Sequence, residues 1–321
     1  MMQENKLKHF ISGNATLVAV IIIMIVASIA FENFFSVNNI ANLFKQASMI
    51  GIMAIGGTFV ILTGGIDLSV GSLFGFSSVI VGMVAAQCEV PFVMAIAAVG
   101  ACAGIGALTG FCVTRLKIQP FIVTLAMMSG VKGLGLLLTQ GGKSLSVSVA
   151  SFKVIATGTV GPIPIPAIIM VAAFVVAAIV AKYTVFGRDC YAIGGNEEAA
   201  VMKGIPVNKV KFFTYLLSGA CAGLAGAIVA ARTYSGNILL GDGYEMDVIA
   251  SVVLGGTLLS GGRGKVLNSM WGAMIITIIG NIINLNQISY LWEGCITGGV
   301  LLIILVLQSR MTRKQHMITQ N

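Results

Sequence analysis

The stretch GRDCYAIGGNEEAAVMKGIPVNKVK, residues 187–211, is a polar island between two long apolar segments, residues 162–182 and 212–232. Each flanking segment has about the 20 residues that an α-helix needs to cross a bilayer. Within the island, Asn196 is a typical N-cap residue and Gly204 is a typical helix stop. The pattern therefore predicts a short helix at the membrane surface, in a chain whose fold is set by membrane spans.

The predicted surface helix covers Glu197–Lys203, about two turns and roughly 10 Å of rise. Its first turn carries two glutamates, whose negative charge interacts favourably with the helix dipole. Two small alanines let a partner approach closely, and a methionine offers an apolar contact. These features favour a docking surface, and a solvated connector between two spans is the alternative. The residues expected to serve a partner are Asn196, Glu197, Glu198, Ala199, Ala200, Met202 and Gly204.

The composition is that of an integral membrane protein. Hydrophobic residues make up 57% of the chain and charged residues only 9%, far from the values of a soluble globular domain. The net charge of +8 does not indicate nucleic-acid binding, because the basic residues form no amphipathic face. The six cysteines contain no C-x-x-C pair, so we interpret them as unpaired small hydrophobic residues.

Apolar segments predict an all-α polytopic membrane protein with about ten transmembrane helices. Three polar stretches interrupt them: residues 31–46 at the outer interface, an outer loop at 144–161, and an insert at 233–247. Glycines in the second span permit close helix contacts; they are Gly51, Gly56 and Gly57. The expected spans are residues 15–31, 47–64, 68–87, 92–114, 120–140, 162–182, 212–232, 248–260, 266–285 and 290–308.

The basic residues predict the orientation. With the N-terminus inside, 14 of the 19 lysines and arginines fall in inner segments, 4 fall in outer segments, and Lys132 lies within the membrane. Lys and Arg are concentrated on the cytoplasmic side of membrane proteins. We therefore expect both termini and the polar island in the cytoplasm.

Ten spans divide into two sets of five. Because five is an odd number of crossings, the second set enters the membrane in the opposite orientation to the first. The loop that carries Asp67 follows the second span, and residues 242–247 follow the seventh span. These are corresponding positions in two inverted five-helix halves. The inverted repeat is a hypothesis at this point, because the two loops share little sequence.

Three stretches resemble one family of transporters. They are LTGGIDLSVGS at residues 62–72, GGNEEAAVMKGIPVNKVK at residues 194–211, and VLGGTLLSGGRGK at residues 253–265. In this order they resemble the permeases of bacterial ATP-binding-cassette (ABC) importers, in the branch that serves ribose, xylose, arabinose, galactosides and related sugars. Glu198-Ala199-Ala200 followed by Gly204 is similar to their "EAA" coupling loop. The likeness extends from about Asn33 to Val306.

The resemblance implies a type II importer fold with residues 1–321 as one permease domain and a cytoplasmic coupling loop at about 183–211. It also implies a second permease subunit, identical or a sister chain, separate ATP-binding subunits, a periplasmic sugar-binding protein, and the bacterial inner membrane. The chain is expected to be no enzyme and to hold no cofactor or metal, with ATP and Mg²⁺ in the partner. Residues 141–144, GGKS, are not a phosphate loop, because Leu137 stands where its first glycine belongs.

Ionisable residues among the spans are candidates for a path or gate, because buried charge is costly in a membrane. Asp67 has two interpretations that stay open: a path residue, or the N-cap of the third span bonded to Ser69. Lys132 lies about 18 Å into its helix, so it lines a wet cavity or extends to the interface. The predicted path residues are Asp67, Ser69, Lys132, Asn281, Asn284 and Glu293, and Asp242 and Glu245 are expected to contact the binding protein.

Few embedded charges favour an uncharged, hydroxyl-rich substrate, and the resemblance implies a pentose, hexose or related polyol. The alternative is a stand-alone ion-coupled secondary sugar transporter, in which Asp67, Lys132 and Glu293 would be the coupling groups. That alternative leaves the capped surface helix unexplained. Uptake that survives a protonophore but stops on ATP depletion would separate the two.

Overall fold

A computed structural model describes residues 15–289, 292, 294–300, 302–303 and 306. In this part, six helices are long and apolar enough to cross a membrane, and two shorter apolar helices accompany them. The all-α polytopic fold is thereby confirmed, whereas the number of about ten spans stays a prediction. The long helices are α3 (Val37–Leu62), α5 (Pro91–Thr114), α6 (Pro120–Leu138), α8 (Ile165–Tyr183), α11 (Val207–Thr233) and α13 (Val266–Leu285), and the shorter ones are α2 (Ala15–Ala30) and α4 (Val70–Ala85).

Smaller elements fill the connections. The strands are two-residue pieces, in which β1 pairs with β4 and β2 pairs with β3, both antiparallel. The remaining elements are β1 (Leu145–Ser146), α7 (Ala150–Thr157), β2 (Thr159–Val160), β3 (Ile163–Pro164), α9 (Val185–Gly195), α10 (Glu197–Met202), β4 (Ser235–Gly236), η1 (Ile238–Gly241) and α12 (Tyr244–Leu254).

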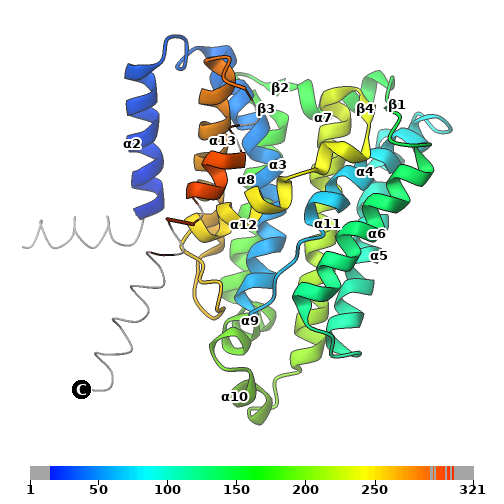
Figure 1. The fold of residues 1–321 in the computed structure, drawn as a ribbon, viewed down its shortest axis with the longest axis vertical. Coiled ribbons are helices and arrows are strands. Elements are labelled where there is room, and N and C mark those ends of the chain that lie inside the picture. The colour runs from blue at the N-terminus through cyan, green and yellow to red at the C-terminus, as the bar shows by residue number, and fades with distance from the viewer. Residues whose placement is uncertain (1–14, 290–291, 293, 301, 304–305, 307–321) are drawn as a thin grey trace, which may run out of the picture.

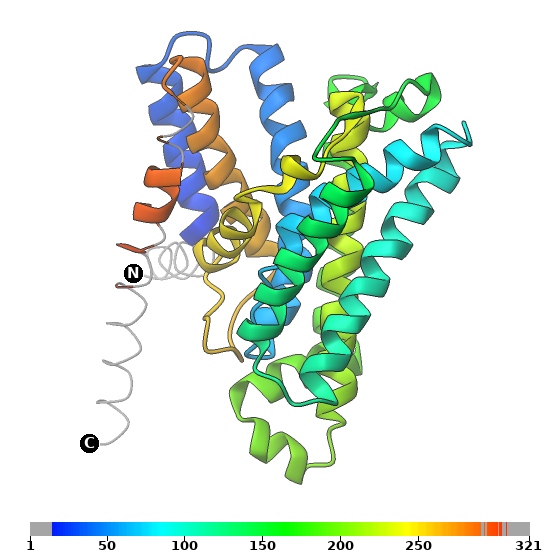
Figure 2. The same ribbon diagram turned by 45° about the vertical axis from the view of Figure 1, so that its right-hand side comes forward.

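The helices form one elongated bundle, and several of their connections lie at its two ends (Figure 1). Residues 86–90, 139–164 and 286–289 lie at one end, and residues 115–119 lie with α9 and α10 at the other (Figure 2). We call these the distal end and the α10 end. Connections at two opposite ends of a helical bundle are expected of a chain that repeatedly crosses a membrane.

Two polar stretches contain helices that the sequence did not predict. The segment 31–46 was expected at the interface, but α3 starts at Val37, because Ser36 caps it by accepting a bond from the Asn39 N–H at 3.3 Å. The expected loop at 144–161 contains α7 and two short strands. The eighth span was placed at 248–260; α12 instead begins at Tyr244 and ends at Leu254.

The second and seventh spans are followed by similar features. After α3, residues 63–69 are non-helical and lead back into the bundle to the start of α4 (Figure 1). After α11, the segment 234–243 leads into the bundle to the start of α12. In addition, α11 packs against α4 and α5, while α3 packs against α12 and α13. This reciprocal packing is what inverted halves would produce, and their superposition stays a prediction.

The prediction of close contacts along the second span is confirmed. A Cβ on Gly56 would come within 2.5 Å of the Cα of Ser218 on α11. A Cβ on Gly51 would meet Met170 on α8, and one on Gly57 would meet Val248 on α12. Helix α3 is consequently the central helix around which three others pack.

Candidate coupling and translocation sites

Helix α10 is capped at both ends by its own sequence. The Asn196 side chain accepts a hydrogen bond from the Ala199 N–H at 2.9 Å. At the other end, the N–H groups of Gly204 and Ile205 donate to the carbonyls of Val201 and Ala200 at 2.9 and 3.0 Å, which is a Schellman motif. Gly204 has a φ of +76°, the left-handed conformation that this motif requires. The predicted boundaries of the surface helix are therefore confirmed to within one residue.

The exposed face of α10 differs in part from the prediction. Ala200 is buried, so it packs inward and is not available to a partner. Glu197 forms an ion pair with Lys211 of α11 at 2.6 Å, which ties α10 to its own chain. Met202 is 88% exposed, and Val201, which the sequence analysis missed, is 59% exposed. Two adjacent apolar side chains thus face solvent at the end of the bundle.

Helix α9 lies between α10 and the bundle (Figure 1), although its residues were predicted to be part of a loop. It begins at the N-cap Thr184, whose hydroxyl accepts from the Gly187 N–H at 3.2 Å. A single residue, Asn196, separates its end from the start of α10. The two helices together form the tip of the α10 end (Figure 1).

Asp67 is buried, and both of its carboxylate oxygens accept hydrogen bonds. One carboxylate oxygen accepts bonds from the Ser69 N–H at 2.9 Å and the Ser69 hydroxyl at 2.6 Å, and the other accepts from the Ser218 hydroxyl at 2.7 Å. The N-cap interpretation is wrong in detail, since Ser69 holds the cap position of α4 without a side-chain bond. Asp67 therefore joins the segment before α4 to the middle of α11.

Asn281 is a structural residue in this conformation. Its side-chain amide exchanges two hydrogen bonds with that of Asn39, at 2.8 and 3.0 Å, and links α13 to α3. Both side chains are buried. Asn281 thus does not reach the polar cavity described next, and Glu293 lies outside the described residues.

A polar cavity of about 650 Å³ lies between α3, the start of α12, α13 and the described part of the chain after it. It contains one predicted path residue, Asn284, and one predicted binding-protein contact, Asp242. The other lining residues were not predicted from the sequence, because they come from helices far apart in the chain. The polar side chains of the lining are Gln46, Arg232, Asp242, Tyr244, Asp247, Thr277, Asn284 and Thr297.

Lys132 and Asp242 form an ion pair beside this cavity. The Lys132 Nζ lies 2.7 Å from one Asp242 oxygen and 2.9 Å from the other. The two side chains are 37% and 51% exposed, respectively. Glu245 is half-buried, and its carboxylate lies against Gly71 at the start of α4. Lys132, which was predicted to line the path, is therefore paired with Asp242, which was predicted to contact the binding protein.

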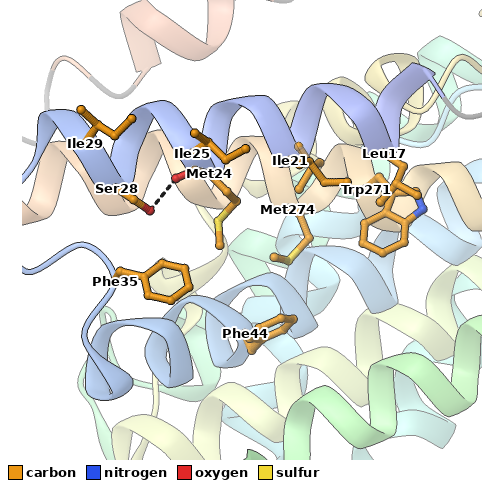
Figure 3. A pocket seen from close by; sticks show the side chains of 11 residues that line it. Leu17, Ile21, Met24, Ile25, Ser28, Ile29, Phe35, Phe44, Trp271 and Met274 are labelled. Carbon is orange, nitrogen blue, oxygen red and sulfur yellow. Dashed lines mark hydrogen bonds between the residues drawn. The ribbon is translucent and has the colours of Figure 1, made fainter. Parts of the chain in front are cut away.

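A second cavity is apolar. It has a volume of about 550 Å³ and lies between α2, the start of α3 and α13 (Figure 3). Ser28 and Trp271 are the lining side chains with polar atoms among the described residues, and the Ser28 hydroxyl donates to the Met24 carbonyl at 2.6 Å. This crevice offers little to a hydroxyl-rich molecule, so the polar cavity is the better candidate for a path.

The sequence of the chain matches a known family over most of its length. A family described as "Branched-chain amino acid transport system / permease component" matches residues 39–305. The chain belongs to this permease family. The permease is 41% identical, over 90% of each chain, to the ribose import permease protein RbsC of Bacillus subtilis (strain 168). No solved structure matches it.

Two further relatives are proteins of Escherichia coli (strain K12). RbsC, a ribose import permease protein, is 37% identical over 94% of the permease and 95% of the relative. The D-allose transport system permease protein AlsC is 32% identical over 89% and 88%, respectively. The resemblance found from three motifs is thus confirmed along nearly the whole chain.

The described basic residues of the permease are concentrated at the α10 end. Four others, Lys45, Lys143, Lys153 and Arg232, lie toward the distal end, and Lys132 lies between the two ends. This asymmetry agrees with the predicted orientation, in which the α10 end is cytoplasmic. The residues of the α10 end are Arg115, Lys117, Lys182, Arg188, Lys203, Lys209, Lys211, Arg263 and Lys265.

Proposed function

We propose that this permease is the membrane-spanning subunit of an ATP-driven sugar importer, and that α10 seats in a separate ATP-hydrolysing subunit on the cytoplasmic side. The exposed pair Val201 and Met202 carries this proposal. These apolar side chains stand on a doubly capped helix at the basic end of the bundle, outside the long apolar helices. Burial of a methionine or valine side chain stabilises a contact by about 1.5–3 kcal/mol.

The proposed substrate is a neutral sugar, ribose or another pentose or hexose, delivered by a periplasmic binding protein to the distal end. The names of the relatives support this class. The polar cavity supports it as well, because its volume of about 650 Å³ lies within the range of about 300–1,000 Å³ of small-molecule sites. Its amide, hydroxyl and carboxylate groups suit sugar hydroxyls. The assembly is proposed to contain two permease subunits in the inner membrane, with both termini in the cytoplasm.

The ion-coupled secondary transporter is not favoured. The relatives at 37–41% identity are named as import permeases and cover most of the chain. Two of the three proposed coupling groups are also engaged, since Asp67 accepts three hydrogen bonds and Lys132 is paired with Asp242. ATP and Mg²⁺ are therefore assigned to the partner subunit.

The test is copurification of the ATP-hydrolysing subunit with permease variants. Met202→Ser removes the most exposed apolar contact of α10 and should weaken the association about 10- to 100-fold, the equivalent of about 1.5–3 kcal/mol. Met83→Ser is the matched control, because Met83 is also exposed but lies near the distal end of α4. Equal copurification of both variants with the wild type would refute the docking role of α10.

A further inference from the structure

Three chain segments meet on the side of α10 that faces the bundle. They are the end of α3, the last turn of α9, and the loop 255–265 between α12 and α13, which reaches down to α9 in both views (Figures 1 and 2). The loop is closed on itself, because the Leu258 N–H donates to the Arg263 carbonyl at 3.0 Å and the Gly261 N–H donates to the Leu258 carbonyl at 2.9 Å. It is therefore a stiff unit.

The contact between the three segments is backbone against backbone. The Gly262 N–H donates to the Leu62 carbonyl at the end of α3, with a distance of 3.0 Å. Gly194 of α9 lies on this bond, since a Cβ there would overlap both the Leu62 oxygen and the Gly262 nitrogen. From the other side, a Cβ on Gly262 would come within 2.6 Å of the Gly195 nitrogen. No side chain separates these segments at this point.

Two side-chain contacts hold the same segments together. The Tyr191 hydroxyl of α9 donates to the Gly264 carbonyl of the loop at 3.0 Å. The rings of Phe186 on α9 and Phe59 on α3 lie 5.7 Å apart. Helix α9 is thus attached to both α3 and the loop, independently of Gly194.

Helix α10 is connected to this contact through α9. One residue joins α10 to α9, Ala200 is buried against the bundle, and Glu197 is tied to Lys211. On the other side of the contact, α3 leads through residues 63–69 to α4, and the loop leads to α12 and α13. Of these helices, α3, α12 and α13 contribute residues to the lining of the polar cavity.

We propose that the contact of Gly194 with Leu62 and Gly262 is the joint through which movement of α10 is transmitted to α3 and to the α12–α13 loop. We call it the glycine joint. Side chains can absorb a displacement by changing rotamer, whereas packed backbone cannot, so this contact moves as a unit. Gly194 is a positioning residue, and its role rests on the proposed function, because α10 must be driven from outside the chain.

Adjacent glycines provide the test. Gly194→Ala adds one methyl group into the joint, whereas Gly195→Ala adds the same group where nothing lies within 4 Å. The purified assembly is placed in proteoliposomes, and uptake of radiolabelled D-ribose is measured against ATP hydrolysis. Gly194→Ala should lower uptake per ATP about 2- to 30-fold, the equivalent of the 0.5–2 kcal/mol by which such positions change coupling. Gly195→Ala should equal the wild type.

The outcomes separate the joint from the docking role. Retained copurification and ATP hydrolysis in Gly194→Ala, with reduced uptake per ATP, supports the joint. The joint is overturned if uptake per ATP in Gly194→Ala equals that of the wild type, or if uptake per ATP falls equally in Gly194→Ala and Gly195→Ala. If Gly194→Ala does not accumulate in the membrane, Tyr191→Phe decides, because it removes the bond to Gly264 without adding atoms: a lowered ratio supports the joint and an unchanged ratio overturns it. Failure of the wild type to copurify with an ATP-hydrolysing subunit would refute the proposed function instead.

Discussion

The hydrogen bond from Ser218 to Asp67 should contribute more to stability than an ordinary buried hydroxyl bond. Ser218→Ala removes the hydroxyl and keeps the Cβ, so the close packing of Ser218 against Gly56 is preserved. Removal of a partner that leaves a buried polar atom unsatisfied costs about 1–3 kcal/mol, against about 0.5–1.5 kcal/mol net for an ordinary hydrogen bond. Ser218→Ala removes the partner of the buried Asp67 Oδ2, so we expect it to lower the free energy of unfolding by about 1–3 kcal/mol.

Ser72→Ala is the matched control. The Ser72 hydroxyl lies in a partly buried site and donates to a backbone acceptor, the Met128 carbonyl of α6, at 2.8 Å. Thermal unfolding of the detergent-solubilised protein can be followed by the reaction of a maleimide dye with the buried thiols of Cys102 and Cys190. At about 2–4 °C per kcal/mol, Ser218→Ala should lower Tm by about 2 °C or more.

Two results would refute a stabilising bond between Ser218 and Asp67. One is a loss of stability in Ser218→Ala no greater than that in Ser72→Ala. The other is additivity with Asp67→Asn, because two residues that share one bond should show a coupling energy in the double variant. Either result would mean that the carboxylate of Asp67 does not anchor α11.

The remaining predictions concern two pairs of residues. Lys132→Asp places two carboxylates together and should reduce sugar uptake about fivefold, the equivalent of about 1 kcal/mol for a half-exposed pair; the exchange of charges with Asp242→Lys should recover most of it, and no recovery would argue against the pair. Asn281→Leu leaves the Oδ1 of the buried Asn39 without a partner, although the Asn39 Nδ2 still donates to the Phe34 carbonyl, and it should cost about 1–3 kcal/mol of unfolding free energy. Leucine at both positions should cost less. A double variant less stable than either single one would contradict this.

Local sequence was sufficient for some features of the candidate sites. The caps of α10 involve residues within five positions of each other, so Asn196 and Gly204 could be assigned from the sequence. The same holds for α6 starting at Pro120 and for α13, whose predicted range was that of the structure. Helix α9 was missed because its three glycines and the pair Arg188-Asp189 are typical of a loop, and packing of its buried side chains, such as Ile193, decides its state.

Partners distant in sequence could not be assigned. Asp67 and Ser218 are 151 residues apart, and Lys132 and Asp242 are 110 residues apart. Arg232 and Asp247 were seen only as a span end and part of an insert, and nothing in their local sequence indicated that they line one cavity. Asn281 was predicted to line a path, but its side-chain amide is paired with that of Asn39, which lies 242 residues away in the sequence.

The sequence by itself determined that this chain is a helical membrane permease and that one short, capped helix stands apart from its spans. Hydropathy and capping are properties of neighbouring residues, so they can be recognised without coordinates. Only the tertiary structure decided which polar groups share a cavity and which satisfy each other, and where α9 touches α3 and the α12–α13 loop. These contacts depend on how helices from distant parts of the chain pack, which no local pattern encodes.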